Sequence, residues 1–271
     1  MIALFVLKLA TGITMMWWLM PRKDVTDGFF RIQTRLLLGL AVLATLLLTG
    51  TPTWNDPVIA DGSPAEFPAE ETWTAVGTAR WIRGMMMAVA VISYLGSIVW
   101  ALGRRLPGNL CIHSLSALCV AALALHAVNV PNATSVVHQL LADFSSAAVA
   151  GGMLTGMLLG HWYLTTPTMS ITPLWWFNKA ILTAAGLRCV ASLWTLLSQS
   201  AIPADSTQQI WLGIRWLGGI AAPVFVVLMV WRILKHRNTQ SATGVLFAGL
   251  ILVFMGEMTA ALLERATLLP W

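Results

Sequence analysis

Long apolar runs alternate with short polar segments along the whole chain. A helix that crosses the hydrocarbon core of a bilayer needs about 20 predominantly apolar residues. Eight runs approach or reach this length, at about residues 2–20, 32–49, 82–102, 110–130, 140–164, 174–197, 210–234 and 243–263. The pattern predicts an all-α integral membrane protein with about eight transmembrane helices.

Composition supports lipid as the surroundings of most of the chain. Of the 271 residues, 58% are hydrophobic and 10% are charged, and the mean hydropathy is +0.76. Soluble proteins carry about 25% charged residues. The net charge of +5 does not indicate a nucleic-acid partner, because the Lys and Arg residues lie at the ends of apolar runs. The longest polar segment is acidic and spans about residues 51–75.

Basic residues gather in alternate connections, which sets the predicted orientation. The connections after the first, third and seventh runs hold most of the Arg and Lys residues, whereas those after the second, fourth and sixth hold acids, Pro and Asn. Cytoplasmic loops are enriched in Lys and Arg, so the first set is predicted to be cytoplasmic and both termini to lie outside. The first run lacks the basic start and cleavage site of a signal peptide. We therefore expect a multi-pass protein of a bacterial inner membrane.

Short sequence matches indicate a tandem repeat of four helices. The third run opens with Arg80-Trp81 and the seventh with Arg215-Trp216, and Thr-Gly followed by Trp at equal spacing occurs in the first and fifth runs. Both matches relate one run to the fourth run after it, which predicts halves at 1–135 and 136–271 around a pseudo-two-fold axis along the membrane normal. A shared site would then lie between the halves. The alternative is chance similarity among apolar helices, which draw on a small set of residues.

The first candidate cofactor-binding site consists of three ionisable residues in the last three runs, Arg188, Arg215 and Glu257. Charged groups inside a bilayer are costly, so each is a functional candidate. Arg188 and Glu257 each lie about 14 residues from the predicted cytoplasmic start of their helices, which places them at one level. We expect Glu257 to pair with Arg188 or Arg215. It could carry protons or bond a quinol hydroxyl, and the alternative is a structural ion pair between helices.

The histidines raise the question of haem b, whose iron takes two imidazoles at one depth. His126 lies near the outer end of the fourth run and His138 follows the turn at Pro131, so the two could be level and are the candidate metal ligands. His161, near the cytoplasmic end of the fifth run, is a further cofactor candidate, although it lies roughly 15 Å too deep to pair with His113. At most one haem is therefore expected. The alternative for His161 is helix packing beside an aromatic belt.

No motif fixes a reaction, so whether the protein is an enzyme stays open. The sequence has no Walker, GxSxG, HExxH or CxxC motif. The favoured hypothesis is a membrane subunit of a respiratory-type electron-transfer complex, which binds quinone or one haem b through polar residues in the outer third of the bilayer. Its partners would be the bilayer and other protein subunits, because the extramembrane parts are too small to fold alone. The alternatives are a small-solute or lipid transporter that uses the cleft between the halves, and a structural or assembly protein.

Overall fold

The computed structural model describes all residues except 1, 50–68, 131–134, 167–168, 200–204 and 268. The described residues are mainly helical and include no strand. Two short elements interrupt the α-helices, the 3-10 turn η1 (Arg22–Asp24) and the π-helical turn η2 (Leu217–Ala221). The α-helices are α1 (Ile2–Leu19), α2 (Asp27–Thr49), α3 (Ala69–Ala101), α4 (Arg105–Val128), α5 (Val136–Thr165), α6 (Thr172–Gln199), α7 (Ser206–Trp216), α8 (Ala222–Lys235) and α9 (Thr239–Thr267).

Eight stretches are long and apolar enough to cross a membrane, which confirms the predicted number for the described part of the chain. The seventh stretch, Ser206–Lys235, consists of α7, η2 and α8 together. It begins earlier than the predicted residue 210 because the Asp205 carboxylate accepts a hydrogen bond from the backbone N–H of Gln208 and caps the helix. The acidic segment predicted at 51–75 lies mostly outside the described residues, and its end already belongs to α3.

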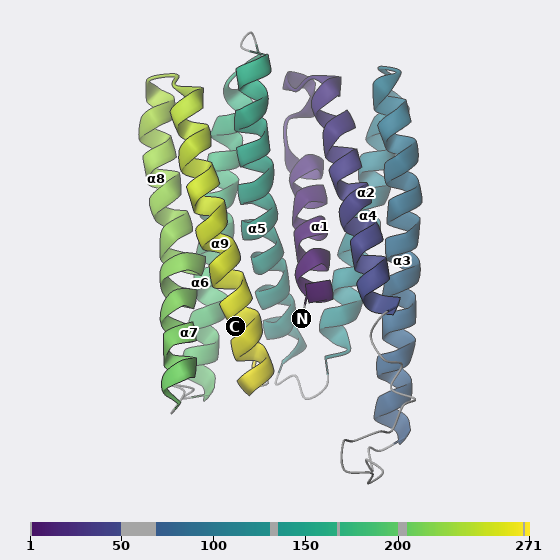
Figure 1. The fold of residues 1–271 in the computed structure, drawn as a ribbon, viewed down its shortest axis with the longest axis vertical. Coiled ribbons are helices and arrows are strands. Elements are labelled where there is room, and N and C mark those ends of the chain that lie inside the picture. The colour runs from purple at the N-terminus through teal and green to yellow at the C-terminus, as the bar shows by residue number, and fades with distance from the viewer. Residues whose placement is uncertain (1, 50–68, 131–134, 167–168, 200–204, 268) are drawn as a thin grey trace.

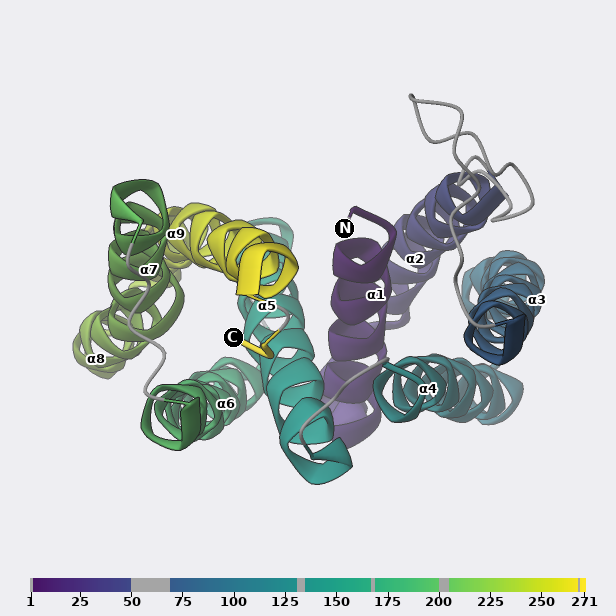
Figure 2. The ribbon, with the colours of Figure 1, turned by 90° about the horizontal axis from the view of Figure 1, so that it is seen from below.

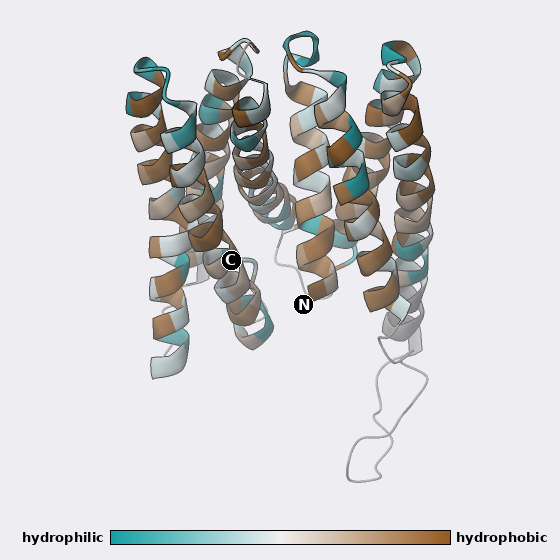
Figure 3. Ribbon diagram, turned by 45° about the horizontal axis from the view of Figure 1, so that its top comes forward, coloured by the Kyte–Doolittle hydropathy of each residue, from teal (hydrophilic) through white to brown (hydrophobic). Residues whose placement is uncertain are grey.

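Large apolar side chains cover the outside of the bundle. Leu46, Val91 and Phe225 are each at least 60% exposed. A soluble monomer rarely exposes so much apolar surface, whereas lipid is a suitable solvent for it. Figure 3 shows hydrophobic residues along the helices and hydrophilic residues concentrated at the turns of one end. The chain is therefore an all-α, polytopic membrane protein.

The helices form two groups of four spans that meet at α1 and α5. In the first group α1 and α3 each pack against both α2 and α4. In the second group α5 and α8 each pack against both α6 and α9, and α7 extends α8. Figure 2 shows α1 and α5 side by side at the centre with one group on either side, and Figure 1 shows both termini toward the same end. The order of neighbours is the same in residues 1–135 and 136–271, while a duplication as its origin stays a prediction.

The two groups touch through their backbones where α1 crosses α5. A Cβ atom on Gly12 would lie 1.8 Å from the carbonyl oxygen of Ala147. A Cβ atom on Gly151 would lie 2.2 Å from the carbonyl carbon of Gly12. Two helices can approach this closely only where the side chains are absent or very small. The crossing therefore fixes how the two groups are joined.

Candidate functional site

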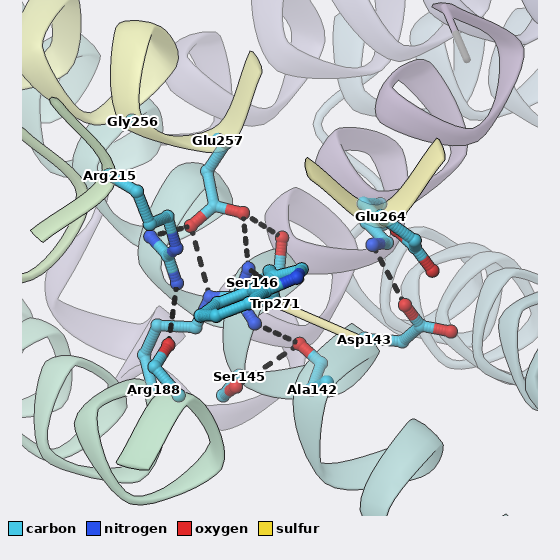
Figure 4. A network of polar contacts seen from close by, with 12 residues as sticks. Ala142, Asp143, Ser145, Ser146, Arg188, Arg215, Gly256, Glu257, Glu264 and Trp271 are labelled. Carbon is cyan, nitrogen blue, oxygen red and sulfur yellow. Dashed lines mark hydrogen bonds and ion pairs between the residues drawn. The ribbon is translucent and has the colours of Figure 1, made fainter. Parts of the chain in front are cut away.

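A buried carboxylate, Glu257 of α9, holds two guanidinium groups. Arg188 of α6 donates from Nε to Oε1 at 3.1 Å and from Nη2 to Oε2 at 2.9 Å. Arg215, near the end of α7, donates from Nη1 to Oε1 at 3.2 Å, and the Ser146 hydroxyl of α5 donates to Oε2. Both arginines are 0% exposed and Glu257 is 5% exposed. The expected pairing of Glu257 with Arg188 and Arg215 is confirmed, and Figure 4 shows the three side chains converging.

Glycines and a π-helical turn bring Arg215 and Glu257 together. Arg215 lies just before η2, where one helical turn contains an extra residue, a feature frequent at functional sites. A Cβ atom on Gly219 would lie 2.0 Å from Nη1 of Arg215. One on Gly256 would lie 2.2 Å from the backbone nitrogen of Gly219. The two backbones therefore touch beside the ion pair, and a side chain at either glycine would separate Arg215 from Glu257.

The cluster of Arg188, Arg215 and Glu257 carries one more positive than negative group, and other oxygen atoms accept hydrogen bonds from most of the remaining donors. Arg188 Nη1 donates to the carbonyl oxygen of Ala142 at 3.0 Å, and Nη2 also donates to a main-chain oxygen of Trp271. Arg215 Nη2 donates to Ser192 Oγ at 3.2 Å. A buried ion pair is stable only when such additional hydrogen bonds offset the cost of removing its charges from water. The geometry is that of a rigid, charged centre inside the second group.

A second polar network links the two groups across the α1–α5 seam. Lys8 Nζ of α1 lies 2.8 Å from Asp143 Oδ1 of α5, and His126 Nδ1 of α4 lies 3.4 Å from Asp143 Oδ2. Gln139 Nε2 donates to Asp143 Oδ2 at 3.2 Å and to Glu264 Oε1 of α9 at 3.3 Å. Four helices, two from each group, therefore contribute to one network. A carboxylate that is 1% exposed needs these partners to stay ionised.

A cavity of about 240 Å³ separates the two networks at the seam between α1, α5 and α9. Its polar wall combines Lys8 and Glu264 from the second network with Ser146 and Glu257 from the first, and it also includes Arg265 of α9. Its remaining wall is mainly apolar and includes Phe5 of α1, Ala260 and Ala261 of α9, and Trp271. Few convergent polar groups on an apolar wall are the usual composition of a small-molecule site. This cavity is the candidate site, and it lies between the two groups of helices.

The three candidate histidines lie in different surroundings. His138 Nε2 lies 3.1 Å from the Ala191 carbonyl oxygen and 3.2 Å from Thr195 Oγ1, and its ring stacks on Trp194 at 4.9 Å. His126 instead faces Asp143 on the seam. His161 is exposed near the opposite end of α5.

This geometry does not fit a haem held by His126 and His138. The Nε2 atom of His138 is already bonded toward α6, whereas His126 points to α5 beside Lys8. Two axial ligands must approach one iron from opposite sides. Within the described residues, no group of three or more His, Cys, Asp or Glu side chains could hold a metal ion either. The cavity at the seam, rather than the histidines, is therefore the better candidate for a ligand.

Sequence reasoning overlooked Gln139 and Glu264 and left Lys8 and Asp143 without a role. A signal was present on α5, where Gln139, Asp143 and Ser146 follow each other at spacings of four and three residues. That spacing places them on one helix face. A polar stripe along an otherwise apolar span indicates a face that does not contact lipid.

Comparison with known proteins finds no match, because no family model, no curated protein and no solved structure resembles the chain closely enough. The function is therefore argued from the cavity and its two networks.

Proposed function

We propose that the protein binds the headgroup of a quinone in the cavity between α1, α5 and α9, as a membrane subunit of an electron-transfer assembly. The observation that carries the proposal is the wall of this cavity, where an apolar surface is interrupted by Lys8, Ser146, Glu257, Glu264 and Arg265. A quinone carbonyl accepts a hydrogen bond from an ammonium or a hydroxyl, and a quinol hydroxyl donates to a carboxylate. Lys8 offers the ammonium and Glu264 a carboxylate, whereas the Ser146 hydroxyl already donates to Glu257.

The size of the cavity supports a small headgroup rather than a large ligand. Sites for drug-sized molecules measure about 300–1,000 Å³, and this cavity measures about 240 Å³. One substituted ring would occupy it, and an isoprenoid tail would then extend toward lipid between α1 and α9. Phe5 and Phe254 make an edge-to-face contact across this seam at 5.2 Å, which supplies aromatic surface for a ring or the start of a tail.

The assembly part of the proposal rests on the chemistry of quinones and on the position of the cavity. Electron transfer to or from a quinone needs a redox partner, and the histidine geometry above does not favour a haem within this chain. A partner subunit would carry the redox centre. It would approach the end of the bundle that holds both termini, because the cavity wall includes residues near the start of α1 and the end of α9.

Photoaffinity labelling tests the proposal directly. The purified protein in nanodiscs is irradiated with an azido-quinone and digested, and labelled peptides are identified by mass spectrometry. Labelling is expected on the α1 and α9 segments that line the cavity. Ala261→Phe fills the cavity without removing a charge and should lower labelling at least tenfold, about 1.4 kcal/mol of binding. Ala248→Phe is the matched control, because Ala248 lies on the exposed face of the same helix.

Two results would contradict quinone binding. One is labelling of wild type that Ala261→Phe and Ala248→Phe reduce equally, because the probe would then occupy the lipid-facing surface. The other is the absence of quinone from an organic extract of protein purified from membranes, together with no labelling by the probe.

Transport is the second candidate function. It is favoured by the position of the cavity between two groups of helices whose backbones touch where α1 crosses α5. Gly12 and Gly151 would allow the groups to pivot about the point where their backbones touch. A cysteine at Ala261 distinguishes the two candidates. Transport predicts that a hydrophilic thiol reagent reaches it from both sides of the membrane, one conformation at a time, whereas a fixed quinone site predicts access from one side only.

A further inference from the structure

A second pocket lies at the opposite end of the first group, where α1 turns into α2 and α3 turns into α4. It measures about 210 Å³ and is lined by Arg22, Lys23, Trp100, Arg105 and Asn109. These residues come from η1, the last turn of α3 and the first turns of α4. Gly103 in the α3–α4 turn has a φ of 65°, which lets the chain reverse tightly and keeps these segments together.

Positive charge in this pocket is incompletely neutralised. Arg105 Nε lies 2.9 Å from Asp27 Oδ1, but no carboxylate of the described residues forms an ion pair with Arg22 or Lys23. Arg22 Nη2 contacts Nε2 of His113 at 3.3 Å, and its buried Nη1 has no hydrogen-bond partner among the described residues. Burial lowers the pKa of Arg22, because water is removed from its charge. An anion in the pocket would supply the missing counter-charge.

Two further polar groups of the pocket are also unpartnered. Trp100 is 3% exposed, and within the part of the chain that the structure describes its Nε1 has no hydrogen-bond partner. Its ring is fixed by stacking on Phe30 at 4.6 Å, and a Cβ atom on Gly108 would lie 2.7 Å from it. Asn109 Oδ1 also lacks a partner in the described ranges, and a half-turn of this amide would present its NH₂ group instead. A buried donor without a partner is costly, so the Trp100 indole N–H is suited to a ligand rich in acceptor oxygens.

We propose that this pocket binds a phosphate group. Arg22, Lys23 and the Trp100 indole N–H would donate to its oxygens, and the N-terminus of α4, which begins at Arg105, adds the positive end of a helix dipole. The pocket lies at the end of the bundle rich in basic residues, where lipid headgroups would meet it. The phosphate could belong to an anionic phospholipid or be free in solution, and the experiment distinguishes these two sources. The proposal is independent of quinone binding.

Native mass spectrometry of the detergent-purified protein tests the proposal. One arm adds phosphatidylglycerol, a second adds diacylglycerol with the same acyl chains, and a third adds inorganic phosphate to displace the bound lipid. We expect phosphatidylglycerol to bind and diacylglycerol not to bind. Displacement by millimolar phosphate would identify free phosphate as a competent ligand, and no displacement would identify the lipid headgroup as the source.

Two substitutions locate the binding. Trp100→Phe keeps the stacked ring and removes only the N–H, and Arg22→Gln removes the unpaired charge; each should weaken binding at least about tenfold, the effect of one hydrogen bond to a charged group. Arg31→Gln is the control, because it removes an exposed charge from α2 near the same end. Lys23→Gln changes an exposed residue, and it gives the same test if the Trp100 and Arg22 variants fail to fold.

The proposal is overturned if diacylglycerol binds as well as phosphatidylglycerol and phosphate displaces neither. It is also overturned if Lys23→Gln and Arg31→Gln weaken lipid binding to the same extent, because the affinity would then reflect the general charge of this end.

Discussion

Glu257→Gln is expected to be among the most destabilising conservative substitutions in this protein. Glutamine keeps the shape of the side chain but removes the negative charge that Arg188 and Arg215 share. The two guanidinium groups would then be buried next to each other without a counter-ion, because both are 0% exposed and both bond Oε1 of Glu257. Removing one partner of a buried ion pair costs about 3–5 kcal/mol.

The magnitude follows from the charge of the cluster. Unit charges about 4 Å apart interact by about 4 kcal/mol at an effective dielectric constant of 20, and Glu257 makes two such contacts, at 2.9 Å and 3.2 Å. Neutralising the carboxylate also recovers its cost of burial, several kcal/mol, so the net loss falls to about 3–5 kcal/mol. Arg215→Gln instead makes the cluster neutral, and we expect it to cost less than about 2 kcal/mol, close to the loss of one charged hydrogen bond.

A double-mutant cycle provides the assay. The free energy of unfolding is measured by titration with SDS in mixed micelles, with tryptophan fluorescence as the signal, for wild type, Glu257→Gln, Arg215→Gln and the double variant. The double variant restores the net charge of the wild-type cluster, so it should be more stable than the sum of the single effects predicts, by at least about 1 kcal/mol. Strict additivity, or Glu257→Gln within about 0.5 kcal/mol of wild type, would refute the idea that charge balance stabilises this cluster.

Two further substitutions test the seam by the same titration. Gly12→Ala places a Cβ atom 1.8 Å from a backbone oxygen of Ala147, which cannot move aside as a side chain can, and should cost about 3 kcal/mol or more. Gly39→Ala, where nothing lies within 4 Å, should leave stability equal or slightly raised, and equal losses in both would show that the crossing is not tight. Lys8→Met leaves the buried Asp143 carboxylate without its ammonium partner and should cost about 3 kcal/mol. Adding Asp143→Asn should recover part of that loss, and a further loss would show that the ion pair does not hold the groups together.

The number and position of the spans could be predicted because lipid imposes a strict requirement on length and polarity. The regular rise of the α-helix also made the shared level of Arg188 and Glu257 predictable. Arg188 and Glu257 could be assigned to one level by counting residues from the ends of their helices, because an α-helix rises by about 1.5 Å per residue. Their bidentate contact follows that expectation.

Counting gives the height of a residue but not the direction in which it points. His138 and Asp143 lie five residues apart on α5, which corresponds to about 140° around the helix. His138 therefore faces α6, whereas Asp143 faces His126 and Lys8. The predicted pairing of His126 with His138 rested on height alone. The direction of each side chain depends on which helices pack against its own helix.

The phosphate pocket could not be predicted from any local pattern. Arg22, Trp100 and Asn109 belong to three separate segments, and each has an ordinary interpretation in the sequence, as a basic loop residue, an interfacial aromatic residue and a helix-start polar residue. Only the packing of η1 beside the α3–α4 turn brings them into one pocket. The unpartnered donors become visible once that packing is known.

The face of α5 that packs against α1 carries polar side chains near one end and small residues further along. This difference explains the position of the cavity. Toward the end that holds the termini, Asp143 and Ser146 face Lys8 and Glu257 through side chains. One turn further along α5, near Gly151, the backbones of α5 and α1 are in contact and leave no space for a ligand. A molecule that reaches the polar wall must therefore come from the side of the termini or from lipid between α1 and α9. The cavity and the phosphate pocket share no lining residue, so they are separate sites.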